Sequence, residues 1–205
     1  MRPAFYPIED FPMLAELASH WSSMQEETLR LQAPLLDINR TEKPHEQVVA
    51  EVQQHLLQGG EYGWLKGWGQ DGGNREWVQY PLVFQDQPMP QAATALPRTL
   101  ALLGQVQGLK VAALARLEPH AWLSSHRHPE VLEEGLLQMH ITLSAAPERN
   151  YAYLNVAGQF HQHNSGTAVI FDGSQDHFVI NASDDARVIL YLEFYPTRLD
   201  INAGR

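Results

Sequence analysis

The chain has 205 residues, 44% hydrophobic and 19% charged, which suits a single domain (residues 1–205) with a substantial core. Its net charge of −10 argues against nucleic-acid binding, and the absence of cysteine excludes disulfides and thiolate metal ligands. Because no apolar run reaches roughly 18 residues and the amino terminus lacks an apolar secretion signal, we expect no membrane association and a cytoplasmic location.

The first 60 residues or so are predicted to be largely helical. One helix is expected over residues 11–31, where five large apolar residues recur at helical spacing: Leu14, Leu17, Trp21, Met24 and Leu31. A second is expected over residues 45–58, with Gly59 and Gly60 ending it. Between the two helices, residues 37–39 and Pro44 indicate a loop.

The remainder, residues 61–198, is predicted to form a β-rich core. Residues 61–96 suit short strands joined by tight turns, with Gly67, Gly69, Gly72 and Gly73 as turn residues, and Pro97 opens a short helix. Six further strands are expected at residues 110–118, 136–144, 151–156, 167–172, 177–181 and 187–195. Short, regularly spaced strands that follow helices predict an α+β layout with an antiparallel, jelly-roll-like barrel on which the helices pack.

The strand at residues 136–144 alternates between apolar and polar residues. Its polar row consists of Gln138, His140, Thr142 and Ser144. If helices cover the outside of the barrel, this row lines a wet interior with His140 in its wall. The alternative is a two-sided sheet whose polar row faces bulk water.

Two histidines two residues apart suggest a metal site. In extended backbone, His126 and His128 point to the same side, and Pro129 favours extended backbone at His128. Imidazoles suit divalent iron, which is commonly held by two histidines and one carboxylate with open positions for reactants. The place usually taken by the carboxylate holds His128, so the third ligand is His128, Glu130 or water. The alternative is a basic surface turn.

Two later residues extend this pattern. His177 comes 51 residues after His126, and Arg187 lies ten positions further on. A guanidinium inside a barrel needs a partner, and a dicarboxylate provides one through two parallel hydrogen bonds.

His161 and His163 have the spacing of a metal-binding pair, but the flanking glycine and asparagine predict an exposed hairpin end. Asp172 is expected to fix a turn or to orient an imidazole.

The ordered set His126, His177 and Arg187 carries a resemblance to a known family. The supporting stretches are Leu96-Pro97-Arg98-Thr99-Leu100, Leu117-Glu118-Pro119, Gln138-Met139-His140-Ile141, Val169-Ile170-Phe171-Asp172-Gly173-Ser174, Arg187-Val188-Ile189-Leu190-Tyr191 and Tyr195-Pro196. From about residue 60 to 198 the chain resembles the aspartyl/asparaginyl β-hydroxylases. These are dioxygenases with a double-stranded β-helix (jelly-roll or cupin-like) barrel that use Fe(II), 2-oxoglutarate and O2.

The resemblance implies roles for individual residues. His126 and His177 would hold iron, Arg187 would anchor the far carboxylate of 2-oxoglutarate, and His140 would lie near its keto-acid end. Two positions depart from the family pattern. Gln138 stands where the family commonly has arginine, and His128 stands where many members have glycine.

We therefore expect an Fe(II)/2-oxoglutarate-dependent dioxygenase that hydroxylates an aspartyl, asparaginyl or related amino-acid substrate, free or within a peptide. The metal ligands would be His126 and His177, with His128, Glu130 or water as the third ligand. Arg187, His140 and Gln138 would lie around the co-substrate. One alternative is a three-histidine, cupin-like metal dioxygenase that needs no 2-oxoglutarate. Another is a barrel without catalysis that binds a small acid.

Overall fold

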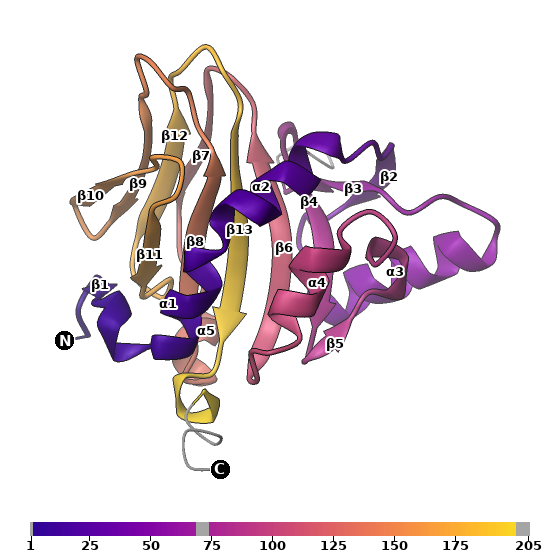
Figure 1. Ribbon diagram of the computed structural model, residues 1–205, viewed down its shortest axis with the longest axis horizontal. Coiled ribbons are helices and arrows are strands. Elements are labelled where there is room, and N and C mark those ends of the chain that lie inside the picture. Colours follow the sequence, from indigo (N-terminus) through magenta and orange to yellow (C-terminus); the bar gives the residue numbers. More distant parts are fainter. Residues whose placement is uncertain (1, 69–73, 200–205) are drawn as a thin grey trace.

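The computed structural model describes residues 2–68 and 74–199, in which the strands form two sheets (Figure 1). The large sheet has the strand order β1-β11-β8-β13-β6-β4-β3-β2, with β5 paired to β4. Its strands are β1 (Phe5–Tyr6), β2 (Leu35–Asn39), β3 (Trp64–Gly67), β4 (Asn74–Phe84), β5 (Gln87–Pro88), β6 (Leu109–Leu117), β8 (Leu137–Ser144), β11 (Ala168–Phe171) and β13 (Arg187–Phe194). The small sheet has the order β10-β9-β12-β7. Its strands are β7 (Ala121–His126), β9 (Ala152–Val156), β10 (Gln159–Gln162) and β12 (His177–Asn181).

The strands from β6 to β13 form a double-stranded β-helix, or jelly roll, as predicted. The chain passes back and forth between the sheets, placing β6, β8, β11 and β13 in one and β7, β9, β10 and β12 in the other. All neighbouring pairs among these eight strands are antiparallel. The prediction found six of them and missed β7, and the short β10 lies where a hairpin end was expected. Together with the packed helices, this barrel gives the expected α+β class.

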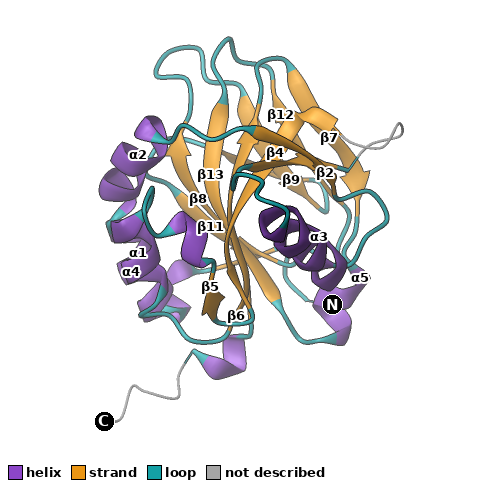
Figure 2. Ribbon diagram, turned by 90° about the vertical axis from the view of Figure 1, so that its right-hand side faces the viewer, coloured by secondary structure: helices purple, strands orange, loops and turns teal. Residues whose placement is uncertain are grey.

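The helices lie on different sides of the large sheet (Figure 2). They are α1 (Pro12–Ser19), α2 (Trp21–Arg30), α3 (His45–Leu57), α4 (Pro97–Leu103) and α5 (Pro129–Glu133), with short 3-10 turns at Ile8–Asp10, Pro90–Ala92 and Pro196–Arg198. α1, α2 and α4 share a hydrophobic core with the outer face of the sheet, and α3 packs on β2 and β3 through a smaller one. No helix in the described part of the chain is long and apolar enough to cross a membrane.

Two predictions in the amino-terminal part were wrong. The helix expected over residues 11–31 is broken at His20, which ends α1 and precedes α2. A straight helix of that length would extend about 30 Å, and the break keeps Leu17 and Met24 buried against a twisted sheet. The loop expected at residues 37–39 is part of β2, which pairs in parallel with β3. Burial of Leu36 and Ile38 under α3 outweighs the turn preference of the flanking aspartate and asparagine.

Other elements agree with their predictions. The helix expected over residues 45–58 is α3, and Gly59 follows it with a φ of +84°, the left-handed conformation typical of a helix end. The short strands expected within residues 61–96 are β3, β4 and β5, and Pro97 begins α4. Of the predicted turn glycines, Gly69, Gly72 and Gly73 lie outside the described residues. β8 alternates as predicted, with Met139, Ile141 and Leu143 in the outer core and the polar row inside.

Glu27 of α2 links two neighbouring helices of the same layer by capping α4. The cap position of α4 is Leu96, which has no polar side chain to offer the first turn. Glu27 accepts hydrogen bonds from the backbone N–H groups of Arg98 (2.8 Å) and Thr99 (2.9 Å) and from the Thr99 hydroxyl (2.7 Å). Burial alone would raise the pKa of Glu27, but the bonds from Thr99 and Arg98 outweigh burial and lower it.

We expect Glu27→Gln to lower the free energy of unfolding at pH 7 by about 1–3 kcal/mol, because an amide N–H replaces one acceptor. A carboxylate with a lowered folded-state pKa stabilises the fold above its ordinary pKa of 4.5, and this contribution disappears as the pH falls through the folded-state value. The difference between variant and wild type should therefore shrink in acid, as measured by urea unfolding. Glu26→Gln, which alters an exposed neighbour, is the control, and equal effects of the two variants would contradict the capping role.

Candidate active site

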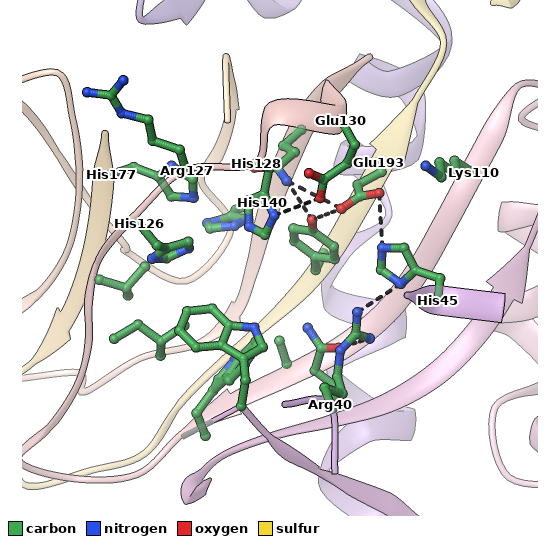
Figure 3. Close-up of a pocket in the computed structure, with 18 of the residues that line it drawn as sticks. Arg40, His45, Lys110, His126, Arg127, His128, Glu130, His140, His177 and Glu193 are labelled. Carbon is green, nitrogen blue, oxygen red and sulfur yellow. Dashed lines mark hydrogen bonds and ion pairs between the residues drawn. The ribbon is translucent and has the colours of Figure 1, made fainter. Parts of the chain in front are cut away.

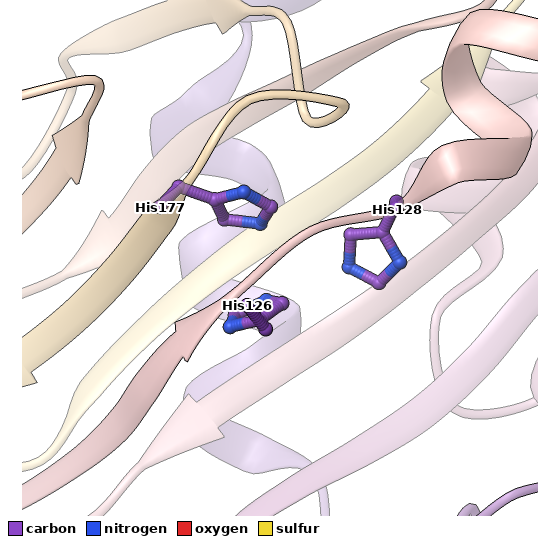
Figure 4. Close-up of side chains that lie close together, drawn as sticks. All are labelled: His126, His128 and His177. Carbon is purple, nitrogen blue, oxygen red and sulfur yellow. The ribbon is translucent and has the colours of Figure 1, made fainter.

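The first two predicted metal-binding residues lie side by side at the ends of adjacent strands. His126 is the last residue of β7, His177 is the first residue of β12, and the two are direct partners in the antiparallel register. Their ring centroids are 4.1 Å apart. His128 follows two residues later and completes a cluster in which one ring nitrogen of each histidine lies within 4.8 Å of the others (Figure 4). Strand pairing thus brings together two histidines that are 51 residues apart in the sequence.

Hydrogen bonds fix the orientation of these rings. His126 Nδ1 lies 2.7 Å from the carbonyl oxygen of Ser124, and His177 Nδ1 lies 2.8 Å from that of Gln175. A carbonyl oxygen only accepts, so each Nδ1 carries the proton and each Nε2 keeps a free lone pair. Burial, aided by the neighbouring imidazoles, lowers the pKa of His126 to about 4 and that of His177 to about 3. Both rings are therefore neutral at physiological pH, the state that binds a metal.

His128 is oriented by a carboxylate instead. Its Nδ1 lies 3.0 Å from Glu130 Oε1 (Figure 3). This hydrogen bond is the main cause of the lowered pKa of Glu130, which is therefore ionised and accepts from His128. Glu130 lies at the start of α5, whose backbone begins at Pro129. The structure thus brings His128 into the cluster and uses Glu130 to hold its ring, which is a common arrangement around metal-bound histidines.

Arg187 lies in the same cavity as the histidine cluster. It is the first residue of β13, lines the cavity and is only 2% exposed. Its Nε and Nη1 atoms are buried and make no hydrogen bond with any described residue. Burial lowers the pKa of its guanidinium to about 9, so it still carries its charge at neutral pH. An unpaired buried cation is costly, which points to an anionic ligand.

The inner wall of the cavity carries a second polar network. Gln138 Nε2 donates to the Tyr191 hydroxyl (2.7 Å) and lies 3.3 Å from Glu193. Tyr191 also donates to Glu193, whose other oxygen faces His45 at 3.5 Å. Burial alone would raise the pKa of Glu193, but His45 and Tyr191 lower it to about 2. Gln138, expected beside the co-substrate, is therefore inside the cavity with its amide N–H groups directed to protein partners.

Arg40 extends this network and was not found from the sequence. Its guanidinium donates hydrogen bonds to Gln79 Oε1 (2.5 Å) and to His45 Nδ1 (2.8 Å). These bonds link the segment before α3 to the barrel. Nothing in the loop sequence signals this role. Tyr191 and Glu193 could have been found, because the two-residue period of a strand places them on the same face of β13 as Arg187.

The prediction for the second histidine pair was wrong. The turn expected there exists, with Ala157 and Gly158 at positive φ, but His161 is half-buried and His163 is fully buried. His163 Nε2 lies 3.2 Å from His140 Nδ1, inside the barrel. Asp172 fixes a turn as expected: its Oδ1 accepts hydrogen bonds from the backbone N–H (3.0 Å) and the hydroxyl (2.7 Å) of Ser174.

The cavity that contains these groups has a volume of about 660 Å³. The rings of Trp68 and Trp77 pack edge to face at its side, and the Trp68 ring contacts that of His126 at a centroid distance of 4.6 Å. Arg127 and Asp176, each next to a histidine of the cluster, form a two-pronged ion pair at the rim, with distances of 2.6 and 2.5 Å. Charged residues of the segment before and at the start of α3 line another part: Arg40, Glu42, Lys43 and Glu46.

Comparison with known proteins places this site in context. The family model described as "Aspartyl/Asparaginyl beta-hydroxylase" matches residues 18–196. A curated relative, the ornithine lipid ester-linked acyl 2-hydroxylase of Rhizobium tropici, is 27% identical over 157 residues, or 75% of this chain. The chain spans about half the length (55%) of that relative.

Solved structures with some similarity include two barrel proteins. One is the Cupin_2 domain of an XRE family transcriptional regulator from Enterobacter cloacae, with a TM-score of 0.41 and 20% identity over 60% of this chain and 99% of that chain. The other is a predicted oxalate decarboxylase from Thermotoga maritima, with a TM-score of 0.40 and 15% identity over 60% of this chain and 84% of that chain.

The family match extends over most of the chain and includes every histidine of the cluster and Arg187. The residues on which the sequence resemblance depended are thus within the matched range. The chain belongs to the aspartyl/asparaginyl β-hydroxylase family.

Proposed function

We propose that this protein is an Fe(II)- and 2-oxoglutarate-dependent dioxygenase that hydroxylates an amino-acid-type substrate. The observation that carries the proposal is the guanidinium of Arg187, which is buried, charged and without a hydrogen-bond partner for Nε and Nη1 in the described residues. It shares one cavity with the three-histidine cluster. A dicarboxylate can reach both, with one carboxylate on Arg187 and its other end toward the cluster.

The histidine cluster fits a divalent iron ion. Three imidazoles with their Nδ1 atoms already bonded present three Nε2 atoms, a donor set that suits Fe(II) and leaves further positions open. His126, His177 and His128 would hold the ion, with Glu130 as the outer carboxylate. When bound, iron would supply the oxygen-activating chemistry that removes hydrogen from an unactivated C–H bond.

The other cavity residues bind the co-substrate, orient neighbouring side chains and limit the entry of water. Arg187 grips the far carboxylate of 2-oxoglutarate through two parallel hydrogen bonds, and His140, which lines the same cavity, lies toward the keto-acid end. Phe171, whose ring packs against His140 and His177, keeps this region apolar and limits water. Gln138 orients Tyr191 and Glu193 and adds no charge to the co-substrate site.

An amino-acid-type substrate suits the remaining wall. Cations and carboxylates alternate there, with Arg40 and Lys43 beside Glu42 and Glu46, so a molecule with an ammonium and a carboxylate group finds partners of both signs. The description of the family names aspartyl and asparaginyl groups. The curated relative is named as a 2-hydroxylase of the ester-linked acyl group of an ornithine lipid, a substrate that contains an amino acid.

Oxygen-dependent formation of succinate tests this proposal. The purified chain is incubated with Fe(II), ascorbate and 2-oxoglutarate, with a panel of free amino acids, short aspartyl and asparaginyl peptides and N-acylated ornithine. We expect succinate only in air, and faster with one member of the panel. Absence of oxygen-dependent succinate throughout the panel would contradict the proposal.

One observation favours a second candidate function. His128 supplies a third imidazole where a carboxylate is more usual, as in a metal dioxygenase with three histidines that needs no 2-oxoglutarate. Such an enzyme would consume oxygen with a substrate at the same rate whether or not 2-oxoglutarate is present. Oxygen-electrode traces with and without 2-oxoglutarate separate the two functions.

A further inference from the structure

Two buried histidines, His140 and His163, lie within electrostatic range of Arg187, and the proposed function uses only His140. His140 lines the cavity, whereas His163, which immediately follows β10, does not. His140 Nδ1 is 3.2 Å from His163 Nε2, and the ring centroids are 5.3 Å apart. This is a direct hydrogen bond between two side chains inside the barrel, and it has two possible directions.

Both rings are neutral. Burial first, and then the charge of Arg187, lower the pKa of His140 and that of His163 well below the ordinary value of 6.5. A neutral imidazole carries one N–H and one lone pair. The direction of the shared hydrogen bond therefore decides which atom of His140 carries its proton.

In one arrangement, His140 donates from Nδ1 to His163. His163 then has its proton on Nδ1, which is buried and has no hydrogen-bond partner in the described part of the chain. His140 would also turn a bare Nε2 lone pair toward the cavity. That lone pair would repel an anionic co-substrate in the cavity.

In the other arrangement, His163 donates from Nε2 to His140 Nδ1. The unpartnered Nδ1 of His163 is then only an acceptor, and buried donors without an acceptor are the rarer case in proteins. His140 carries its proton on Nε2 and can donate a hydrogen bond into the cavity. This arrangement agrees both with the buried atoms of the pair and with an anion in the cavity.

We propose that His163 is a positioning residue that fixes His140 as a hydrogen-bond donor to the dicarboxylate co-substrate bound in the cavity. The role of His163 as donor to His140 depends only on the structure, whereas the carboxylate as recipient rests on the proposed use of 2-oxoglutarate. This role requires one N–H directed from the side chain at position 163 to His140 Nδ1.

The position of the protons can be measured directly. Long-range ¹H–¹⁵N NMR spectra of the metal-free full chain, labelled with ¹⁵N at histidine, distinguish the two neutral forms of each ring. We expect His140 and His163 to carry the proton on Nε2, in contrast to His126 and His177, which carry it on Nδ1. Protonation of His140 on Nδ1 would overturn the inference whether or not 2-oxoglutarate binds.

Substitutions test the consequence for binding. Anaerobic calorimetry of the Fe(II)-loaded chain with 2-oxoglutarate should show about five- to tenfold weaker affinity for His163→Leu, the effect of one buried hydrogen bond. His163→Gln keeps a terminal N–H near the Nε2 position and should restore affinity to within about twofold of wild type. His161→Leu, which changes a neighbour with no bond to His140, is the matched control. Iron affinity should be unchanged in all three.

The outcomes separate this inference from the proposed function. If the wild-type chain binds no 2-oxoglutarate, the proposed function fails, and the NMR result alone decides the role of His163. If the wild type binds but His163→Leu binds equally well, the inference fails and the proposed function stands. Should His163→Leu not fold, His163→Asn replaces it, because its shorter amide leaves His140 Nδ1 unpaired and is expected to weaken binding equally.

Discussion

Replacing Arg187 with methionine should weaken 2-oxoglutarate binding at least tenfold, about 1.4 kcal/mol or more, and should at the same time stabilise the metal-free protein. The first effect follows from the loss of two parallel charge-assisted hydrogen bonds. The second follows from the removal of a buried cation that has two nitrogen atoms without partners. A methionine of similar length fills the space without that cost.

The stability effect depends on the charge of the guanidinium. Burial lowers the pKa of Arg187 to about 9, so the unfavourable buried charge is fully present at neutral pH and is relieved only as the pH rises above that value. We therefore expect the methionine variant to gain about 1 kcal/mol or more in unfolding free energy at pH 7. Calorimetric titration with 2-oxoglutarate and urea unfolding measure the two effects.

Arg30→Met is the control for this experiment, because Arg30 is exposed at the end of α2. It should change neither property. An Arg187→Met variant that binds 2-oxoglutarate as tightly as the wild type would exclude the assigned role. A variant that binds weakly and is also less stable would show that Arg187 has a structural partner.

Replacing His177 with alanine should abolish iron binding, because alanine has no atom that can bind the metal. Within the described residues, only His126 and His128 would remain in the cluster. His128→Ala should also lose iron if the third ligand is an imidazole, whereas water as the third ligand predicts little change. Glu130→Gln should weaken iron binding about 10- to 100-fold, as expected when the group that orients a metal-bound histidine is removed.

Iron content after anaerobic loading and desalting, with affinities from competition against a chelator, measures this series. Arg187→Met belongs in the same series and should retain iron. His20→Ala, which removes an exposed histidine between α1 and α2, is the control. Normal iron content in His177→Ala would contradict the assignment of the cluster as the metal centre.

Much of the barrel could be predicted because its strands alternate cleanly. β8 and β13 each place apolar residues under the helices and polar residues inside, so their two-residue period fixes both the strand and its inner face. β7 was missed because Trp122 is exposed while Leu123 is buried, so no polar row marks its outer face. β2 was missed because its stability comes from α3 and β3, which are distant in the sequence.

Only part of the site, like only part of the fold, could be predicted from the sequence. His126, His128 and His177 could be grouped from spacing and family resemblance, and the strand register then brings them together. The role of Glu130 stayed open, because only the fold shows that its carboxylate lies behind the ring of His128. His163 was misassigned because glycine and asparagine mark the nearby turns correctly but say nothing about which way the intervening side chains point.

The central claim is that one cavity holds iron on three histidines and a dicarboxylate on Arg187. An anaerobic crystal structure of the chain with Fe(II) and 2-oxoglutarate tests it most directly, with anomalous scattering to locate the iron. We predict an iron peak bonded by His126, His128 and His177, and a carboxylate of 2-oxoglutarate paired with the Arg187 guanidinium. Iron bound elsewhere, or a 2-oxoglutarate molecule that leaves Arg187 unpaired, would contradict it.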